Sequence, residues 1–269
     1  MSLVNLNFES QYLNGNTEIS IVLPDKPQEV QANSFYSSGN KYKVLWLLHG
    51  GYGDHSDWVR KSMIEVYASE LNLIVVMPSA LNSFYSNWPK TMMGYNMYDF
   101  ITEELMPLVY NWFPASSKRG DNFIAGLSMG GFGTVKFAVN YPEKFAAAAV
   151  LSAAPINIAG LPGALDSPIF HNLIDNIGGT DKFIKSADNT WAGIIETAKT
   201  KSLPALYFSC GTDDFLYKDT YLPFKEYAKA NGIKIQFEEI ASYGHEWRFW
   251  DIAIQKALRF FGFEIAENI

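Results

Sequence analysis

A serine held between glycines is the sharpest chemical signal in the sequence. The segment Gly126–Gly131 (GLSMGG) begins at the end of an apolar run, Asp121–Ser128, and leads into a stretch with helical spacing. A serine on a tight turn between strand and helix has a strained backbone, and its hydroxyl projects beside a helix N-terminus that favours developing negative charge. The motif alone occurs by chance in about one chain in ten of this length. The strand before it and the helix after it therefore favour Ser128 as a nucleophile over a glycine-rich packing or phosphate-binding turn.

A nucleophilic serine requires a base, and the chain has only four histidines: His49, His55, His171 and His245. With this serine motif the acid and then the histidine follow the serine in the chain. His171 lies in a segment without regular pattern, before any candidate acid. His245 lies between a strand-like run, Ile233–Ile240, and the last expected helix, so its imidazole can reach the carboxyl edge of the sheet. We predict His245 as the base.

The third group must be a carboxylate that fixes the tautomer of the imidazole. The segment after the apolar run Leu203–Gly211 supplies Asp213 and Asp214, both between the serine and His245 in the chain. The Gly-x-x-Asp spacing favours Asp214, and Asp213 is the alternative. Asp219 lies further along, where a surface charge is the simpler interpretation.

Acyl transfer also needs donors for a tetrahedral oxyanion. One is the backbone N–H of Met129, directly after the serine, and the second is expected from an early loop after a strand. The segment His49–Gly53 (HGGYG) fits this position, because glycines let the backbone approach a substrate closely. We predict the N–H of Gly51 as the second donor, with Gly50 as the alternative, and assign His49 a structural role in orienting the loop.

Several aromatic residues are candidates for the walls of a substrate pocket. Trp88 is the best of them because it lies in an expected loop after a core strand, and an apolar wall there suits acyl chains or aromatic acids. Core packing is the alternative for each aromatic residue. With Gly50 from the glycine loop, the candidate substrate-binding residues are Gly50, Tyr52, Trp88, Phe215 and Trp247.

Other kinds of site do not fit the spacing. His49 and His55 lack the His-Glu-x-x-His pattern of a zinc site, and no Gly-x-x-x-x-Gly-Lys-Ser/Thr phosphate loop occurs. The single cysteine, Cys210, ends an apolar strand and is expected to be a small buried residue. We expect no metal and no organic cofactor.

Composition limits the partners. The chain has 269 residues and a formal net charge of −7, without a basic block, which argues against nucleic acid or an anionic membrane as a partner. No signal-peptide pattern and no run of about 18 apolar residues is present. We expect a soluble cytoplasmic protein that acts on a small molecule.

The apolar runs are continuous, as in strands covered on both faces, and stretches with helical spacing separate them. Two such stretches are Asp57–Glu70 and Asn96–Phe113. This alternation predicts a doubly wound α/β sheet in a single domain over residues 1–269. At the start, Leu3–Ser10 and Thr17–Pro24 alternate around Asn14-Gly15, which predicts an antiparallel hairpin at the sheet edge. Residues 155–198 have no regular pattern and are expected to form an irregular, cap-like excursion.

Taken together, six segments resemble the esterase D family of α/β-hydrolases, and most closely its bacterial tributyrin esterase branch. They are LLHGGYGDHSDW, NSFYSNW, DFITEELMP, IAGLSMGGFGTVKFAVNYPEKFAAAAVLSA, CGTDDFLY and GHEWRFWD. The resemblance implies an α/β-hydrolase fold, with Ser128, Asp214 and His245 as the triad and Gly51 and Met129 at the oxyanion positions. It also implies hydrolysis of short-chain acyl esters, and homo-oligomers occur among these relatives.

The resemblance leaves the substrate open. Feruloyl esterases, S-formylglutathione hydrolases and acyltransferases share the fold, although HGGYG differs from the S-formylglutathione hydrolase loop, which has a larger residue at the position of Gly51. A non-catalytic binding protein is an alternative of another class, and the complete triad argues against it. A peptidase usually carries a gating domain, for which the chain has no room.

Overall fold

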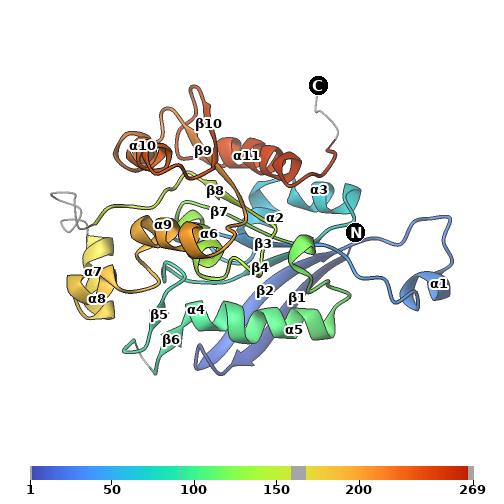
Figure 1. Cartoon of the computed structure of the whole chain (residues 1–269). Coiled ribbons are helices and arrows are strands. Elements are labelled where there is room, and N and C mark those ends of the chain that lie inside the picture. The colour runs from blue at the N-terminus through green and yellow to red at the C-terminus, as the bar shows by residue number, and fades with distance from the viewer. Residues whose placement is uncertain (1, 92, 159–167, 266–269) are drawn as a thin grey trace.

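The central feature is an eight-stranded sheet in the order β1-β2-β4-β3-β7-β8-β9-β10. The computed structural model describes residues 2–91, 93–158 and 168–265 (Figure 1). Strands β3, β4, β7, β8, β9 and β10 pair in parallel, whereas β1 and β2 join the sheet antiparallel through β4. The strands are β1 Ser2–Ser10, β2 Gly15–Leu23, β3 Val44–Leu48, β4 Ile74–Pro78, β7 Asn122–Leu127, β8 Ala147–Leu151, β9 Ala205–Gly211 and β10 Gln236–Ile240. The predicted α/β class is confirmed.

Helices cover both faces of this sheet, which explains why its inner strands are apolar without alternation. One face packs against α4 (Met97–Asp99), α5 (Met106–Trp112), α6 (Met129–Asn140), α9 (Thr190–Thr200) and α10 (Leu222–Ala230). The other packs against α2 (Asp57–Lys61), α3 (Ile64–Glu70) and α11 (Trp247–Phe260). All five residues of β3 are buried, as are those of β4 and β8.

The N-terminal hairpin follows its sequence pattern. Strands β1 and β2 pair from Ser2 opposite Leu23 to Ser10 opposite Gly15, and Asn14 in the turn has the positive φ of 52° that asparagine tolerates. Short elements complete the chain: α1 Ala32–Tyr36, the paired β5 Asn87–Trp88 and β6 Tyr95–Asn96, and a 3-10 turn at Arg119–Asp121.

Two expected helices are less regular than their spacing suggests. The stretch predicted as one helix over Asp57–Glu70 is interrupted at Ser62, whose extended backbone separates α2 from α3. The stretch Asn96–Phe113 is helical through Met97–Trp112 but contains a π segment, Phe100–Leu105. A second π segment, Tyr217–Tyr221, leads into α10.

The prediction of an irregular excursion over residues 155–198 is wrong for most of its length. From residue 168 the chain forms α7 (Pro168–Ile177), α8 (Thr180–Ile184) and α9. Helix α7 is amphipathic, and Leu173 and Ile174 on it are buried. Gly178 and Gly179, between α7 and α8, interrupt the helical spacing in the sequence. Residues 159–167, which belong to the same predicted excursion, lie outside the described residues.

A buried lysine ties this helical excursion to the rest of the molecule. Lys136 on α6 pairs with Asp188, between α8 and α9, and contacts the Ser86 hydroxyl. Its Nζ also donates to the Phe84 carbonyl at 2.9 Å. Burial lowers the pKa of Lys136, and the charge of Asp188 offsets part of this effect. The ammonium is therefore compensated only while these groups surround it.

We predict that Lys136→Ala lowers the free energy of unfolding by about 3–5 kcal/mol, because it leaves the Asp188 carboxylate without its cation. Urea denaturation measures the change. Lys199→Ala is the matched control, since it breaks an exposed pair with Glu196 and should cost less than about 1 kcal/mol. A Lys136→Ala cost no larger than that of the control would contradict the anchoring role.

Candidate active site

Ser128 stands on a strained turn between β7 and α6. Its φ of 51° and ψ of −119° lie in a region that residues with a side chain rarely adopt, and its N–H donates to the Leu151 carbonyl at 2.9 Å. The neighbouring glycines make this turn possible. A Cβ on Gly126 would lie 2.4 Å from the carbonyl oxygen of Gly130, and one on Gly130 would lie 2.4 Å from that of Leu48.

Three predicted residues from distant parts of the chain meet at the carboxyl edge of the sheet. His245 Nε2 lies 2.9 Å from Ser128 Oγ, and His245 Nδ1 lies 2.8 Å from Asp214 Oδ2. Asp213, the alternative acid, is not the partner of His245; its N–H donates to the Tyr243 carbonyl. Asp219 is exposed in the π segment before α10.

The surroundings of Asp214 define the state of the imidazole. The carboxylate belongs to a residue only 4% exposed, and its second oxygen, Oδ1, accepts the Leu216 N–H at 2.9 Å. A carboxylate at Nδ1 keeps the proton there, so Nε2 is free to accept the Ser128 hydroxyl proton. The ring of His245 also contacts Phe215, at 4.6 Å between centroids, and Trp250, at 5.0 Å.

The glycine loop after β3 comes close to the serine turn. A Cβ at Gly50 would lie 2.5 Å from Leu127 Cδ1 and 3.5 Å from Ser128 Cβ. His49 holds this loop from within: its Nδ1 lies 2.6 Å from the Gly50 carbonyl, and its Nε2 accepts the Ala80 N–H at 2.9 Å. Burial lowers the pKa of His49, which keeps its ring neutral and able to accept that bond.

The residue that follows Gly51 is fixed by a side chain that the sequence analysis did not single out. Asn82 Oδ1 accepts the N–H of Tyr52 at 2.7 Å, and Tyr52 itself has a φ of 61°. Asn82 also lies beside Gly51, at 3.7 Å from the place of a Cβ. The available signal was its position just after the β4 strand, in the segment NSFYSNW. Asn82 thus orients the peptide next to the predicted donor.

The second predicted donor, Met129, is the first residue of α6. The first N–H groups of a helix have no intrahelical partner, so this N–H is available beside the Ser128 hydroxyl. The helix also directs the positive end of its dipole at the same place. The turn and the glycine loop together place two backbone segments around the space above Ser128.

The predicted pocket aromatics are distributed over different surroundings. Tyr52 is 91% exposed, and Phe215 is exposed over the His245 ring. Trp247 packs edge-on against Trp58 and Trp250. Trp88 is not in a loop but on the short strand β5, where its indole donates to the Ser83 carbonyl at 2.8 Å and its ring packs with the excursion helices.

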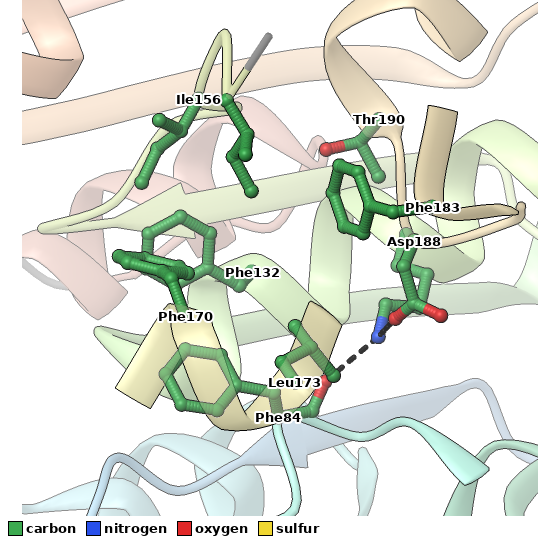
Figure 2. Close-up of a pocket in the computed structure, with 10 residues that line it drawn as sticks. Phe84, Phe132, Ile156, Phe170, Leu173, Phe183, Asp188 and Thr190 are labelled. Atoms are coloured by element: carbon green, nitrogen blue, oxygen red, sulfur yellow. Dashed lines mark hydrogen bonds and ion pairs between the residues drawn. The ribbon is translucent and has the colours of Figure 1, made fainter. Parts of the chain in front are cut away.

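A small apolar cavity lies between α6 and the excursion helices (Figure 2). Its volume is about 30 Å³. The rings of Phe84, Phe132 and Phe170 form a triangle, with centroids 5.7 to 6.1 Å apart. Phe132 lies one helical turn after the serine, and its N–H donates to the Ser128 carbonyl at 3.1 Å. Residues Ile156, Ile158, Leu173, Phe183 and Thr190, with the Lys136–Asp188 pair, complete the lining.

The remaining candidates lie elsewhere. Cys210 is buried, and burial raises the pKa of its thiol, which makes it a poor nucleophile. His171 is on α7, paired with Asp175 at 3.2 Å.

Within residues 2–91, 93–158 and 168–265, no cluster of three or more histidine, cysteine or acidic side chains could hold a metal. Over the same residues, no helix is long and apolar enough to span a membrane.

A mostly parallel sheet, helices on both faces and a serine on the turn after its fifth strand in order define an α/β-hydrolase fold. The family described as "Putative esterase" matches residues 10–261. The chain therefore belongs to this esterase family, and it is a carboxylic ester hydrolase.

Individual relatives agree with this assignment. An acetyl esterase from Caldicellulosiruptor saccharolyticus is 32% identical over 96% of this chain and 97% of its own. Two solved Staphylococcus aureus structures cover 97% of this chain and 98% of their own: the S-formylglutathione hydrolase FrmB, at 34% identity and a TM-score of 0.79, and the fluorophosphonate-binding serine hydrolase FphF, at 31% and 0.78. A ferulic acid esterase, at 23% identity and a TM-score of 0.72, shares the fold.

We predict that Asn82→Ala lowers kcat by about 10- to 100-fold with little change in KM, because the loop that carries Gly51 loses its anchor and a small misplacement of a catalytic group is costly. Steady-state kinetics on a p-nitrophenyl ester measure the change. Thermal unfolding is the control, and a midpoint close to that of the wild type is expected. A variant that retains full kcat would show that Asn82 does not position the loop.

Proposed function

We propose that the protein is a serine carboxylesterase that hydrolyses short-chain acyl esters through Ser128, His245 and Asp214. The observation that carries this proposal is the unbroken chain of hydrogen bonds from the serine hydroxyl through both imidazole nitrogens to a buried carboxylate. The resemblance of six sequence segments to the tributyrin esterase branch of the esterase D family supports the same substrate class.

The reaction has two acyl-transfer steps. In the first, His245 Nε2 accepts the proton of the Ser128 hydroxyl as Oγ attacks the ester carbonyl, and Asp214 stabilises the imidazolium. The tetrahedral intermediate collapses to the acyl-enzyme, and His245 donates its proton to the departing alcohol. In the second, His245 Nε2 accepts a proton from water as the water oxygen attacks the acyl carbon. The bond between that carbon and Ser128 Oγ then breaks, His245 returns the proton to Oγ, and the acid is released.

The oxyanion of each intermediate is stabilised by the backbone N–H groups of Gly51 and Met129. Two features support this assignment: Met129 begins α6, and the glycine loop approaches the Ser128 turn at Gly50. One such donor contributes about 3–4 kcal/mol of transition-state stabilisation in a comparable site. The buried, neutral His49 and the Asn82 side chain hold this loop in place before the substrate arrives.

The small volume of the cavity beside α6 supports a short acyl group. A cavity of about 150 Å³ accepts benzene in another protein, whereas this one measures about 30 Å³. Its wall includes Phe132, one turn from the nucleophile, so an acyl chain on Ser128 Oγ has this apolar space within one helical turn. An acetyl to butyryl chain suits the space better than a feruloyl group does.

A second candidate substrate is S-formylglutathione. The likeness to FrmB at 34% identity favours it, and a formyl group is smaller still than an acetyl group. Direct comparison of kcat/KM for S-formylglutathione and p-nitrophenyl acetate separates the two. A preference for the ester supports the proposed substrate class, and a preference of more than about 100-fold for the thioester would replace it.

A cytoplasmic location and assembly into homo-oligomers stay predictions from the sequence.

We predict that Ser128→Ala lowers kcat by about 10⁴- to 10⁶-fold and that Asp214→Asn lowers it by about 10⁴-fold, the latter because the imidazole then adopts the wrong tautomer. Initial rates on p-nitrophenyl acetate measure both. Asp213→Asn is the matched control and should stay close to wild type. If Asp213→Asn were as impaired as Asp214→Asn, the acid assignment would be in error.

A fluorophosphonate probe gives an independent readout of the nucleophile. The wild type should be labelled on Ser128, and peptide mass spectrometry locates the adduct. Labelling should be absent in Ser128→Ala, whose thermal unfolding should match the wild type. An adduct on any other residue would overturn the nucleophile assignment.

We predict that Phe170→Ala shifts the preferred acyl length upward, because removing one ring of the aromatic triangle enlarges the cavity. In the wild type, kcat/KM should rise to about four carbons and then fall, since each methylene buried contributes about 0.8 kcal/mol only while space remains. A p-nitrophenyl ester series from two to ten carbons measures this. Trp112→Ala, which removes an exposed ring from α5, is the control. An unchanged profile in Phe170→Ala would contradict the pocket assignment.

A further inference from the structure

An open groove lies on the α2, α3 and α11 side of the sheet, away from the apolar cavity. Its volume is about 490 Å³, within the range of small-molecule sites. The lining combines three cationic side chains with one indole: Arg60 and Lys61 at the end of α2, and Trp247 and Arg248 at the start of α11. Ser62, Met63 and Asp251 form the rest.

The groove is connected to the catalytic histidine through packed rings. Trp247 contacts Trp250 with 5.2 Å between centroids, and Trp250 contacts His245 with 5.0 Å. Trp247 and Arg248 also follow His245 in the chain by two and three residues. Since His245 donates its proton to the departing alcohol in the proposed mechanism, the leaving group lies on the histidine side of Ser128.

The charges of the groove are not balanced within the protein. Asp57 pairs with Lys61 at 2.8 Å, and Asp251 accepts the Met63 N–H and the Tyr67 hydroxyl. Glu246, next to the groove in the chain, accepts the Gly244 N–H. Arg60 and Arg248 are both exposed, and neither guanidinium group has an ion pair or hydrogen bond among the described residues. Two arginines are therefore available to an anion, in a chain whose net charge is −7.

The position of Arg248 is not explained by the stability of its helix. It lies in the first turn of α11, a helix of 14 residues without a side-chain N-cap. A cation at a helix N-terminus is unfavourable, and an acidic residue there would stabilise the helix. The guanidinium instead matches the planar geometry of a carboxylate or phosphate. Beside it lies the half-buried Trp247, whose ring also has Lys61 Nζ at 5.2 Å from its centroid.

We propose that this groove binds an anionic leaving group, so that the preferred esters join a short acyl chain to an alcohol carrying a carboxylate. This inference rests on the proposed esterase function and specifies its substrate class. Arg60 and Arg248 bind the anion, while Trp247 packs against the carbon skeleton between the anion and the ester. The acyl chain lies on the other side of Ser128, beside α6.

The test compares phenyl acetate with 4-acetoxybenzoate, which carries a carboxylate on the same leaving group, in the wild type and in Arg60→Ala/Arg248→Ala. The double variant should lower the ratio of kcat/KM for the anionic ester to that for the neutral ester by about five- to tenfold, mostly through KM. The wild-type ratio should also fall as salt rises from about 0.01 M to about 1 M, because salt screens exposed charges.

Arg259→Ala is the matched control, since it removes an exposed arginine from the last turn of the same helix. Its ratio should equal that of the wild type. The phosphate ester of acetoxyphenol, tested alongside, shows whether phosphate is bound in preference to carboxylate, and a larger loss with either anion supports the groove. A ratio that is the same in the double variant, Arg259→Ala and wild type overturns the inference.

The neutral ester separates the two proposals. If the wild type hydrolyses phenyl acetate and Ser128→Ala does not, the esterase proposal holds whatever the groove does. If the wild type hydrolyses neither ester, the proposed esterase function is wrong. Hydrolysis of both with an unaltered ratio in the double variant removes only the anion site.

Discussion

The close approach of α6 to the end of β3 is the constraint on which the site depends. At Gly130 the two backbones are so near that a Cβ would meet the Leu48 carbonyl oxygen at 2.4 Å, and at Gly126 a Cβ would meet α6 itself at the same distance. No residue with a side chain fits either position without movement. The contact fixes the strained Ser128 turn against the loop that begins at His49, so Ser128 and the glycine loop keep one relative position.

Hydrogen bonds to buried polar groups around this contact hold the site in one arrangement. His49 is neutral because burial lowers its pKa, and in that form it joins the Gly50 carbonyl to the Ala80 N–H. Asp214 is also buried, but it is charged and satisfied by His245 and the Leu216 N–H. Both groups would be costly to leave without partners. The free energy of those bonds therefore holds the loops that carry the chemistry.

Local sequence patterns predicted the sheet and the three residues that meet at its edge. Continuous apolar runs predicted the inner strands, the order serine, acid, histidine selected His245, and the Gly-x-x-Asp spacing selected Asp214. The structure brings Asp214 and His245 into contact. The excursion was mispredicted because Gly178 and Gly179 interrupt the helical spacing between α7 and α8. Asn82 and the Lys136 cluster depend on contacts 30 to 52 residues apart in the chain, which no local pattern reveals.

The apolar cavity and the cationic groove are built from separate parts of the chain, and this separation has a consequence for substrate choice. The apolar cavity is formed by α6 and the excursion helices, whereas the cationic groove is formed by α2 and α11 on the opposite face of the sheet. Groups that share no contacts contribute nearly additively. In the proposed scheme, cavity volume selects the acyl chain and groove charge selects the leaving group, so each can change while the triad stays the same. In this scheme, relatives that share Ser128, Asp214 and His245 catalyse the same kind of reaction, and the cavity and the groove determine which ester is hydrolysed.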